Sequence, residues 1–395
     1  MFMAVLININ SLLYTFFILP MRAGWGFTKS FWGWAKHKRL RFDMYFFSII
    51  LIVSLIFTLT ADISVIYHWV KGKAFIKLLT LYVILEMSDL LARNVGKDLI
   101  YSLARDVYYR RNCMKMVFLL WIYTLFHSYI LLVQMLTLNS VFKSSKDTFF
   151  LFLLSNNFTE IKIYVFKKTD WTKLYDIGTR DICERVQQYM YITYILFSNY
   201  LDQWTITTLV LFCLTEFIVD WIKNFFFNND NAHDPSIYLS HRYLLWRIFT
   251  DWRQKRIARE APDDEKLEED RENEDILKDL HTDLREFKGY SSQKGFIEQW
   301  NKIKDVLCKG KARDMTLLRY TLNEYYHSSI FQNFMILPQT CLILRLFESI
   351  IREKEFLLDE IFIIVVWVVC IGIVFECILS NIIKSISKNV TKITR

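Results

Sequence analysis

The sequence predicts an all-α membrane protein, a polytopic transmembrane bundle of about six to eight helices with a charged cytoplasmic helical insert. Of its 395 residues, 53% are hydrophobic and 17% are aromatic, an apolar content above that of typical soluble domains. Only 10 residues are Gly and 4 are Pro, which favours long helices over a turn-rich β fold. Long apolar segments alternate with short basic ones, as in chains that cross a bilayer several times.

In the first half of the chain, residues 2–20 are apolar and lack a basic leader or a cleavage site, so they predict a retained helix. The basic, Trp-rich stretch 21–43 predicts a cytoplasmic loop with an aromatic belt. Residues 44–67 and 116–136 are long enough to cross a hydrocarbon core of about 30 Å. Between them, 75–91 is shorter and acidic in part, and it predicts an interfacial or re-entrant helix.

In the second half, residues 189–201 and 205–227 predict a tight helical hairpin. A strongly charged soluble stretch follows and contains two amphipathic helical patterns. Residues 330–347 and 361–383 predict the last two membrane helices. The tail beyond them is basic, which predicts a cytoplasmic C-terminus.

The chain is thus expected to have three parts: a membrane helical region (1–252), the charged cytoplasmic insert (253–327), and a C-terminal helix pair with its basic tail (328–395). The formal net charge is +8, and Lys and Arg cluster beside apolar stretches. This pattern favours membrane lipids over nucleic acid as the partner of the positive charge. The 7 Cys and 7 His residues form no recognisable ligand spacing, so we expect no metal and no cofactor.

Polar residues inside the predicted membrane segments form an intramembrane polar cluster of His127, Glu216, Asp220 and Arg345. Glu216 and Asp220 are four positions apart, which places both carboxylates on one face of a helix. Charges at bilayer depth are costly, so they normally face the bundle interior and pair there. Two interpretations follow. One is an ion or proton path, and the other is a buried clamp in which Arg345 bridges to Glu216 or Asp220.

A polar segment follows the short apolar run at 149–154. Its candidates for partner binding or membrane-surface contact are Asn156, Asn157, Glu160, Lys162, Lys167 and Lys168. One interpretation is a membrane-surface helix, since each Lys beside anionic headgroups contributes about 1 kcal/mol. The other is a docking platform for a partner. Asn156 or Asn157 is predicted to cap a helix that begins near Phe158.

This segment also carries a resemblance. The block Asn156-Asn157-Phe158-Thr159-Glu160-Ile161-Lys162, followed by Asp181-Ile182-Cys183-Glu184-Arg185, resembles the transmembrane anterior posterior transformation protein family. The stretches Leu85-Glu86-Met87-Ser88-Asp89, Gly96-Lys97-Asp98 and Glu216-Phe217-Ile218-Val219-Asp220 fit the same family. The resemblance implies residence in the endoplasmic reticulum membrane and action with a SUN-domain membrane protein in protein folding or quality control. It supplies no catalytic residues.

Three functions compete at this point. The leading expectation, which the resemblance implies, is a non-enzymatic scaffold of the endoplasmic reticulum membrane. The chain also contains none of the common phosphate-binding, hydrolase or metalloprotease motifs. The second is an ion or small-molecule transporter or channel that uses the intramembrane charges. The third is a lipid-modifying enzyme, for which His127 lacks an acidic partner at motif spacing.

Overall fold

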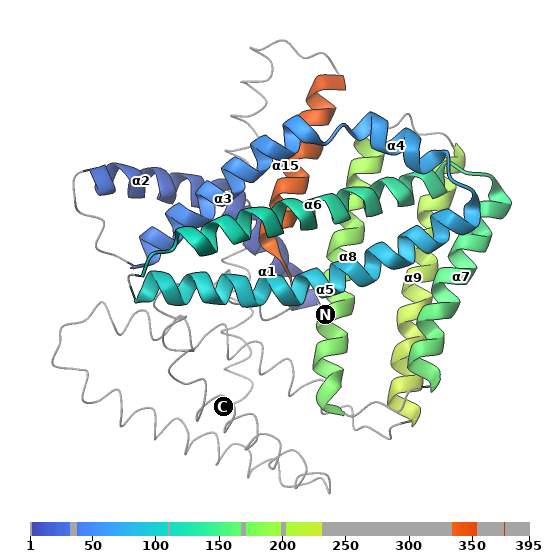
Figure 1. Ribbon diagram of the computed structural model, residues 1–395. Coiled ribbons are helices and arrows are strands. Elements are labelled where there is room, and N and C mark those ends of the chain that lie inside the picture. The colour runs from blue at the N-terminus through green and yellow to red at the C-terminus, as the bar shows by residue number, and fades with distance from the viewer. Residues whose placement is uncertain are drawn as a thin grey trace, which may run out of the picture.

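A computed structural model describes residues 2–31, 38–109, 111–166, 171–198, 203–230 and 334–353, together with Phe375. All regular elements in these ranges are helical, which confirms the predicted class (Figure 1). They are α1 (Phe2–Leu13), a π-helical segment η1 (Tyr14–Ile18), α2 (Leu19–Phe31), α3 (Lys38–Thr60), α4 (Ile63–Lys71), α5 (Phe75–Tyr108), α6 (Met114–Phe142), α7 (Lys146–Phe166), α8 (Trp171–Ser198), α9 (Gln203–Asp230) and α15 (Ile336–Glu353).

Four helical stretches in the described residues are long and apolar enough to cross a membrane: Val5–Thr28, Lys38–Thr60, Met114–Phe142 and Gln203–Lys223. The first runs through α1, η1 and α2 without a break. Its π-helical segment comes just before Pro20, a residue that has no N–H to donate to the preceding turn. These helices confirm the membrane helical architecture.

Residues 44–67, which the sequence predicts as one span, form two helices. α3 ends at Thr60, and α4 begins two residues later behind a helix cap. The Asp62 carboxylate accepts hydrogen bonds from the backbone N–H groups of Ser64 and Val65, at 3.0 and 3.4 Å. A capping carboxylate satisfies N–H groups that have no partner within the helix, so the chain turns at this point.

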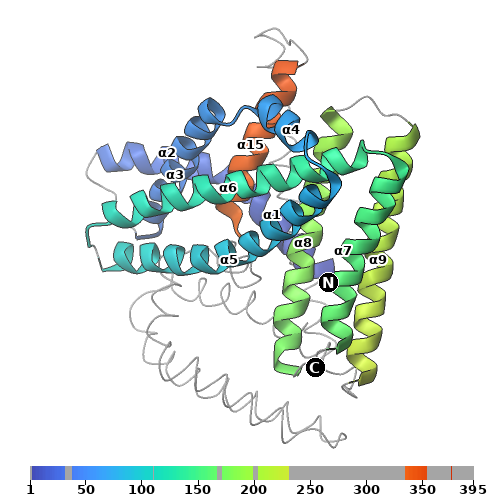
Figure 2. The same ribbon diagram turned by 45° about the vertical axis from the view of Figure 1, so that its right-hand side comes forward.

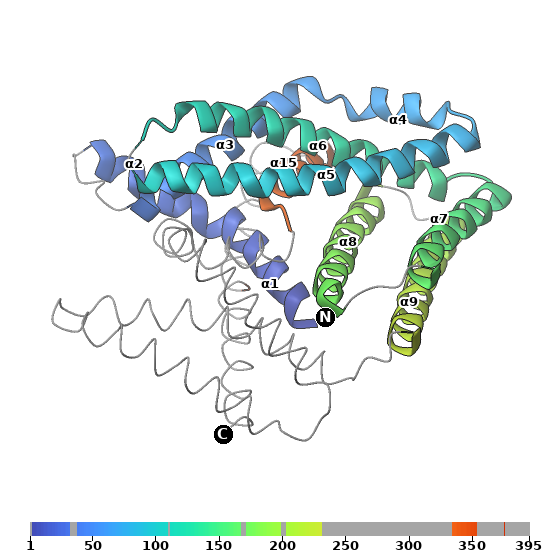
Figure 3. The same ribbon diagram turned by 60° about the horizontal axis from the view of Figure 1, so that its bottom comes forward.

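The helix predicted at 75–91 is not short, because it continues to Tyr108 as part of α5. α5 is one helix of 34 residues, about 51 Å long at 1.5 Å per residue. It packs along α6 and returns the chain from the end of α4 to the beginning of α6 (Figures 1 and 3). At its far end it meets the start of α3, where Arg41 Nη2 donates to the Val107 carbonyl at 3.2 Å.

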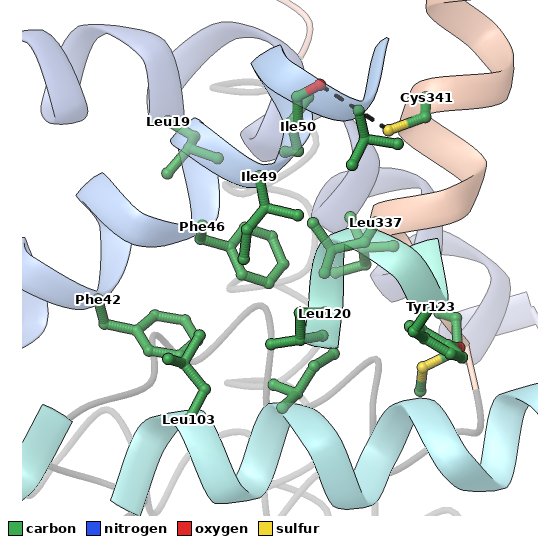
Figure 4. Close-up of a cluster of buried hydrophobic side chains, with 14 of the residues drawn as sticks. Leu19, Phe42, Phe46, Ile49, Ile50, Leu103, Leu120, Tyr123, Leu337 and Cys341 are labelled. Atoms are coloured by element: carbon green, nitrogen blue, oxygen red, sulfur yellow. Dashed lines mark hydrogen bonds between the residues drawn. The ribbon is translucent and has the colours of Figure 1, made fainter. Parts of the chain in front are cut away.

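The hydrophobic core between α2, α3, α5, α6 and α15 is shown in Figure 4. Phe42, Phe46 and Ile49 of α3 point toward Leu103 of α5 and Leu120 of α6. α15 closes this core with Leu337 and Cys341, and the Cys341 thiol lies 4.0 Å from the Ile50 carbonyl. Residues more than 280 positions apart in the sequence therefore share one core.

The tight hairpin predicted from 189–201 and 205–227 is not formed. α9 packs along α7, whereas α8 packs against α1 and α15 and reaches α9 through charged side chains (Figures 1 and 2). α7 and α9 start at the same end, where Lys146 Nζ lies 5.2 Å from the Trp204 ring centroid. The sequence gives the apolar lengths of these helices but not the neighbour of each.

The outward faces of several helices are apolar, as lipid contact requires. Exposed hydrophobic side chains recur along α3, α6 and α9: Leu51, Leu55, Leu59, Phe118, Ile122, Phe126, Val210, Leu214, Phe217 and Trp221. α5 shows the same pattern, with Val83, Met87 and Leu91 exposed and the charged residues Asp89 and Arg93 on the inner face. The predicted insert at 253–327, the basic tail, and 361–383 apart from Phe375 lie outside the described residues.

Candidate functional site

Asp89 of α5 lies at the centre of a buried polar cluster. Its Oδ1 is 2.7 Å from Nε2 of His127 on α6, and its Oδ2 accepts a hydrogen bond from the Arg93 guanidinium one turn along α5. The other ring nitrogen of His127, Nδ1, lies 2.8 Å from the Tyr123 hydroxyl. That hydroxyl is also 3.0 Å from the Ala92 carbonyl. A carboxylate, an imidazole and a phenol are thus connected in series across two helices.

The cluster extends to a third helix through Gln187 of α8. Arg93 Nη2 donates to Gln187 Oε1 at 3.0 Å, and Gln187 Nε2 donates to Gln134 Oε1 of α6 at 3.1 Å. Gln187 Nε2 also donates to the Tyr191 hydroxyl at 2.6 Å. We call these side chains the α5–α6–α8 network: Asp89, Arg93, Tyr123, His127, Gln134, Gln187 and Tyr191.

The α5–α6–α8 network is sealed from the surface. Asp89 and His127 are each 1% exposed and Arg93 is 5% exposed. The ion pair within it has one carboxylate and one guanidinium, so its charges offset each other in the low-dielectric interior. Arg93 Nη1 finds no acceptor among the described residues, so the guanidinium is not fully satisfied there. Such a network holds helices in one register, because separating them leaves buried polar groups without partners.

Gly96 explains how α5 and α6 approach closely enough for the network to form. A Cβ at this position would lie 2.1 Å from the Tyr123 hydroxyl oxygen and 2.8 Å from the sulfur of Met335. Any side chain at residue 96 would therefore push Tyr123 away from Ala92 and His127. Gly96 belongs to one of the stretches that carry the family resemblance.

A second charged cluster joins α8 to α9. Glu216 and Asp220 share one helix face, as their spacing predicts, but their partner is Arg185. Arg185 Nε and Nη2 donate to the two carboxylate oxygens of Asp220 at 2.8 and 2.7 Å, and Nη1 donates to Glu216. Lys223 Nζ adds contacts with Asp220 at 3.5 Å and with Asp181 at 3.8 Å.

The predicted bridge from Arg345 to Glu216 or Asp220 is wrong. Arg345 lies on α15, and its Nε and Nη2 donate to the Ala61 carbonyl at 3.1 and 2.6 Å. Its Nη1 donates to Glu348 on the same helix. Arg345 therefore closes the C-terminal end of α3, where backbone carbonyls lack helical partners and a cation is favoured.

The polar segment at 155–168 falls partly within the described residues. The predicted cap near Phe158 is wrong, because α7 begins at Lys146 and passes through Asn156 and Asn157 without a break. Asn156 is half-buried, whereas Asn157 is buried at 9% exposure and its Oδ1 accepts no hydrogen bond from the described residues. Glu160 and Lys162 lie on the last turns of α7, and Lys167 and Lys168 lie outside the described residues.

Asp89, Arg93, Gln187 and Arg185 are the main site residues that sequence reasoning missed. One signal for Arg93 was available, since it lies four positions after Asp89 and such pairs attract each other on a helix. Arg185 lies within the family-like stretch, yet its neighbours in sequence are polar and hide its burial. Among the described residues, no group of three His, Cys, Asp or Glu side chains is arranged to hold a metal ion.

Comparisons with known proteins agree with this architecture. A family described as "Eukaryotic membrane protein family" matches residues 36–392. "Transmembrane anterior posterior transformation protein 1" of Mus musculus is 28% identical over 279 residues, which are 65% of this chain and 49% of the mouse protein. "Endoplasmic reticulum membrane protein 65" of Saccharomyces cerevisiae is 25% identical over 297 residues, which are 63% of this chain and 53% of the yeast protein.

"Protein TAPT1 homolog" of Dictyostelium discoideum is 29% identical over 286 residues, which are 63% of this chain and 34% of that protein. The chain thus spans between about a third and about half of the length of these relatives. No solved structure matches it. The family match covers most of the chain, including the helices that carry the buried polar clusters, and the chain belongs to the eukaryotic membrane protein family that includes the transmembrane anterior posterior transformation proteins.

Proposed function

We propose that this chain is a non-enzymatic scaffold of the endoplasmic reticulum membrane. The observation that carries the proposal is the use of the buried charges. In the α5–α6–α8 network Asp89 bonds to Arg93 on its own helix and to His127 on α6, and in the Arg185 cluster the charged groups bond across α8 and α9. Buried polar groups arranged in this way fix the packing of a membrane bundle. The name of the yeast relative supports the endoplasmic reticulum as the location.

Transport is the competing function, and burial argues against it. A transport path needs ionisable groups that face a water-filled cavity and exchange ions or protons with it. Asp89 and His127 are each 1% exposed, and Glu216 is 5% exposed. Arg93 neutralises the carboxylate of Asp89, and Arg185 neutralises that of Glu216. No mobile ion is needed to balance these charges.

An enzymatic function would start from His127, which does have a carboxylate beside it. The pair of Asp89 and His127, extended by Tyr123, has the connectivity of an acid–base relay. A general base must also reach the proton that it removes from a substrate. With 1% exposure, His127 has no surface to present to one, so the same geometry favours a structural role.

The partner that we propose is a SUN-domain membrane protein, as the family resemblance implies. The region that we assign to its docking is the polar segment at the end of α7, with Glu160, Lys162, Lys167 and Lys168. This segment is rich in charge and directly follows the apolar run at 149–154 of α7. Membrane lipids are the second class of partner, because the apolar outer faces of α3, α6 and α9 require them.

The test is affinity purification of the full-length protein in mild detergent, followed by mass spectrometry of the proteins that accompany it. We expect stoichiometric recovery of a SUN-domain membrane protein. The double variant Lys167→Glu with Lys168→Glu should lose it, because reversing two charges disrupts a complementary surface. Lys71→Glu with Lys73→Glu, at the end of α4 and just after it, makes the same charge change elsewhere and should retain it. Recovery of the chain alone as a stable oligomer would contradict the proposal and favour transport.

A further inference from the structure

A cavity of about 430 Å³ lies where the ends of several helices converge. Its polar lining includes Tyr67, Asn139, Lys143, Arg345, Ser349 and Arg352. It opens beside the cap that separates α3 from α4, and it contains none of the α5–α6–α8 network. Its volume is within the range of small-ligand sites, which is about 300–1,000 Å³.

Helical spacing directs the cationic side chains into this cavity. Arg345, Ser349 and Arg352 follow one another on α15 at intervals of four and three residues, and thus share one face. Asn139 and Lys143 do the same at the end of α6. Two helices that are far apart in the sequence therefore bring three cations to one cavity.

The acidic groups nearby do not cancel this charge. Asp62 lines the cavity, but its Oδ1 is already engaged by the first N–H groups of α4. Glu348 accepts hydrogen bonds from both Arg345 and Arg352. Three cationic side chains and two carboxylates leave the cavity with a net positive charge at neutral pH.

Arginine donors remain available for a ligand. A guanidinium has five N–H donors, and the hydrogen bonds of Arg345 to Ala61 and Glu348 use three of them. The side chain of Arg352 is 74% exposed, so it can turn toward a bound group without loss of packing. Serine and tyrosine hydroxyls and the Asn139 amide complete a lining suited to oxygen-rich anions.

Aromatic and basic side chains place the cavity at the level of lipid headgroups. Lys143 Nζ lies 5.6 Å from the Tyr67 ring centroid, and Lys73 Nζ lies 4.3 Å from that of Trp69 on the adjoining turn. The apolar candidate spans of α3 and α6 end here. Trp and Tyr gather at the membrane–water interface, and Lys extends there toward phosphates.

We propose that this cavity binds an anionic phosphate group, supplied either by a lipid headgroup or by a free phosphate. Arg345 would hold the phosphate from the base of the cavity, and Lys143 and Arg352 would contact it from the rim. Arginine forms paired N–H bonds to phosphate oxygens, and lysine adds a point charge. The inference stands independently of the scaffold proposal, since it uses none of the same residues.

The experiment measures ligand binding to the full-length protein in mild detergent, by native mass spectrometry. The probes are dioctanoyl phosphatidic acid, dioctanoyl phosphatidylcholine as a zwitterionic comparison, and inorganic phosphate as a competitor. The test variant is Lys143→Gln with Arg352→Gln. The matched control is Lys115→Gln with Arg105→Gln, which makes the same charge change on α6 and on another helix at the opposite end of the bundle.

We expect one phosphatidic acid to bind more tightly than phosphatidylcholine. The test variant should weaken it by about tenfold or more, because two charge-assisted contacts are lost, and the control should leave it unchanged. Displacement of phosphatidic acid by millimolar phosphate would identify free phosphate as a ligand of the same site. If phosphate does not displace it, the ligand is the lipid. If phosphatidic acid binds wild type no better than phosphatidylcholine and inorganic phosphate does not bind either, the proposal is overturned. An equal loss of binding in the test and control variants would also overturn the proposal. The unfolding temperature of each variant, measured without ligand, shows whether that variant is folded.

Discussion

Replacing Asp89 by Asn changes little in shape but removes the charge that neutralises Arg93. The guanidinium of Arg93 stays in place at 5% exposure, with one fewer carboxylate partner, and His127 loses an ionised acceptor. Breaking a buried ion pair by removing one partner costs about 3–5 kcal/mol, because the remaining charge is left uncompensated. We expect Asp89→Asn to lower the free energy of unfolding by this amount.

The second step of the same experiment removes both charges. Arg93→Met in the Asp89→Asn background leaves no uncompensated charge, so the double variant should be more stable than the sum of the single losses predicts. The expected coupling energy is about 0.5–3 kcal/mol. Unfolding is followed by tryptophan fluorescence during titration of sodium dodecyl sulfate into mild-detergent micelles, since the chain has 12 Trp residues.

The matched control is Asp98→Asn, the same chemical change at an exposed position of α5. It should alter stability by no more than about 0.5 kcal/mol. The reasoning would be refuted if the loss in unfolding free energy of the double variant equalled the sum of the losses of the two single variants. Such additivity would mean that Asp89 and Arg93 do not depend on each other. A loss in Asp98→Asn equal to that in Asp89→Asn would refute it as well, since burial would then play no part.

Three further changes test other contacts, all by the same unfolding measurement. Gly96→Ala should cost about 1–3 kcal/mol through the clash with Tyr123, and a neutral result would show that α5 and α6 are not in close contact. Arg185→Met should cost about 1–3 kcal/mol by leaving Glu216 buried without its cation, and Glu216→Gln in the same chain should recover part of that loss. Asp62→Ala should cost about 0.5–2 kcal/mol by removing the cap of α4, and Asp62→Asn should cost less.

The helical class and most membrane segments were predictable, because length and apolar content alone decide whether a helix can cross a bilayer. α5 shows where this reasoning fails. Its outer face is apolar, but Asp89 and Arg93 on its inner face lower the average over any window. Hydropathy sums both faces of a helix, so buried charge on one face hides how far the apolar face extends.

The candidate site shows a second limit. The four-residue spacing of Glu216 and Asp220 predicted their common face, and α9 confirms it. Their partner was predicted as Arg345 but is Arg185, because spacing along one helix says nothing about which helix packs beside it. His127 was predicted among the intramembrane polar residues, and its carboxylate partner lies 38 positions away on another helix. Contacts between helices depend on the packing of the whole bundle.

The central claim is that the buried charges hold helices together and do not conduct ions. The most direct measurement is proton and potassium flux into sealed proteoliposomes that contain the full-length chain, compared with protein-free vesicles and with Asp89→Asn. We expect the flux into vesicles with the wild-type chain to equal that into empty vesicles under an imposed gradient or membrane potential. A wild-type flux well above that level, lost in Asp89→Asn and retained in Asp98→Asn, would show that the network is a conducting path and would contradict the account.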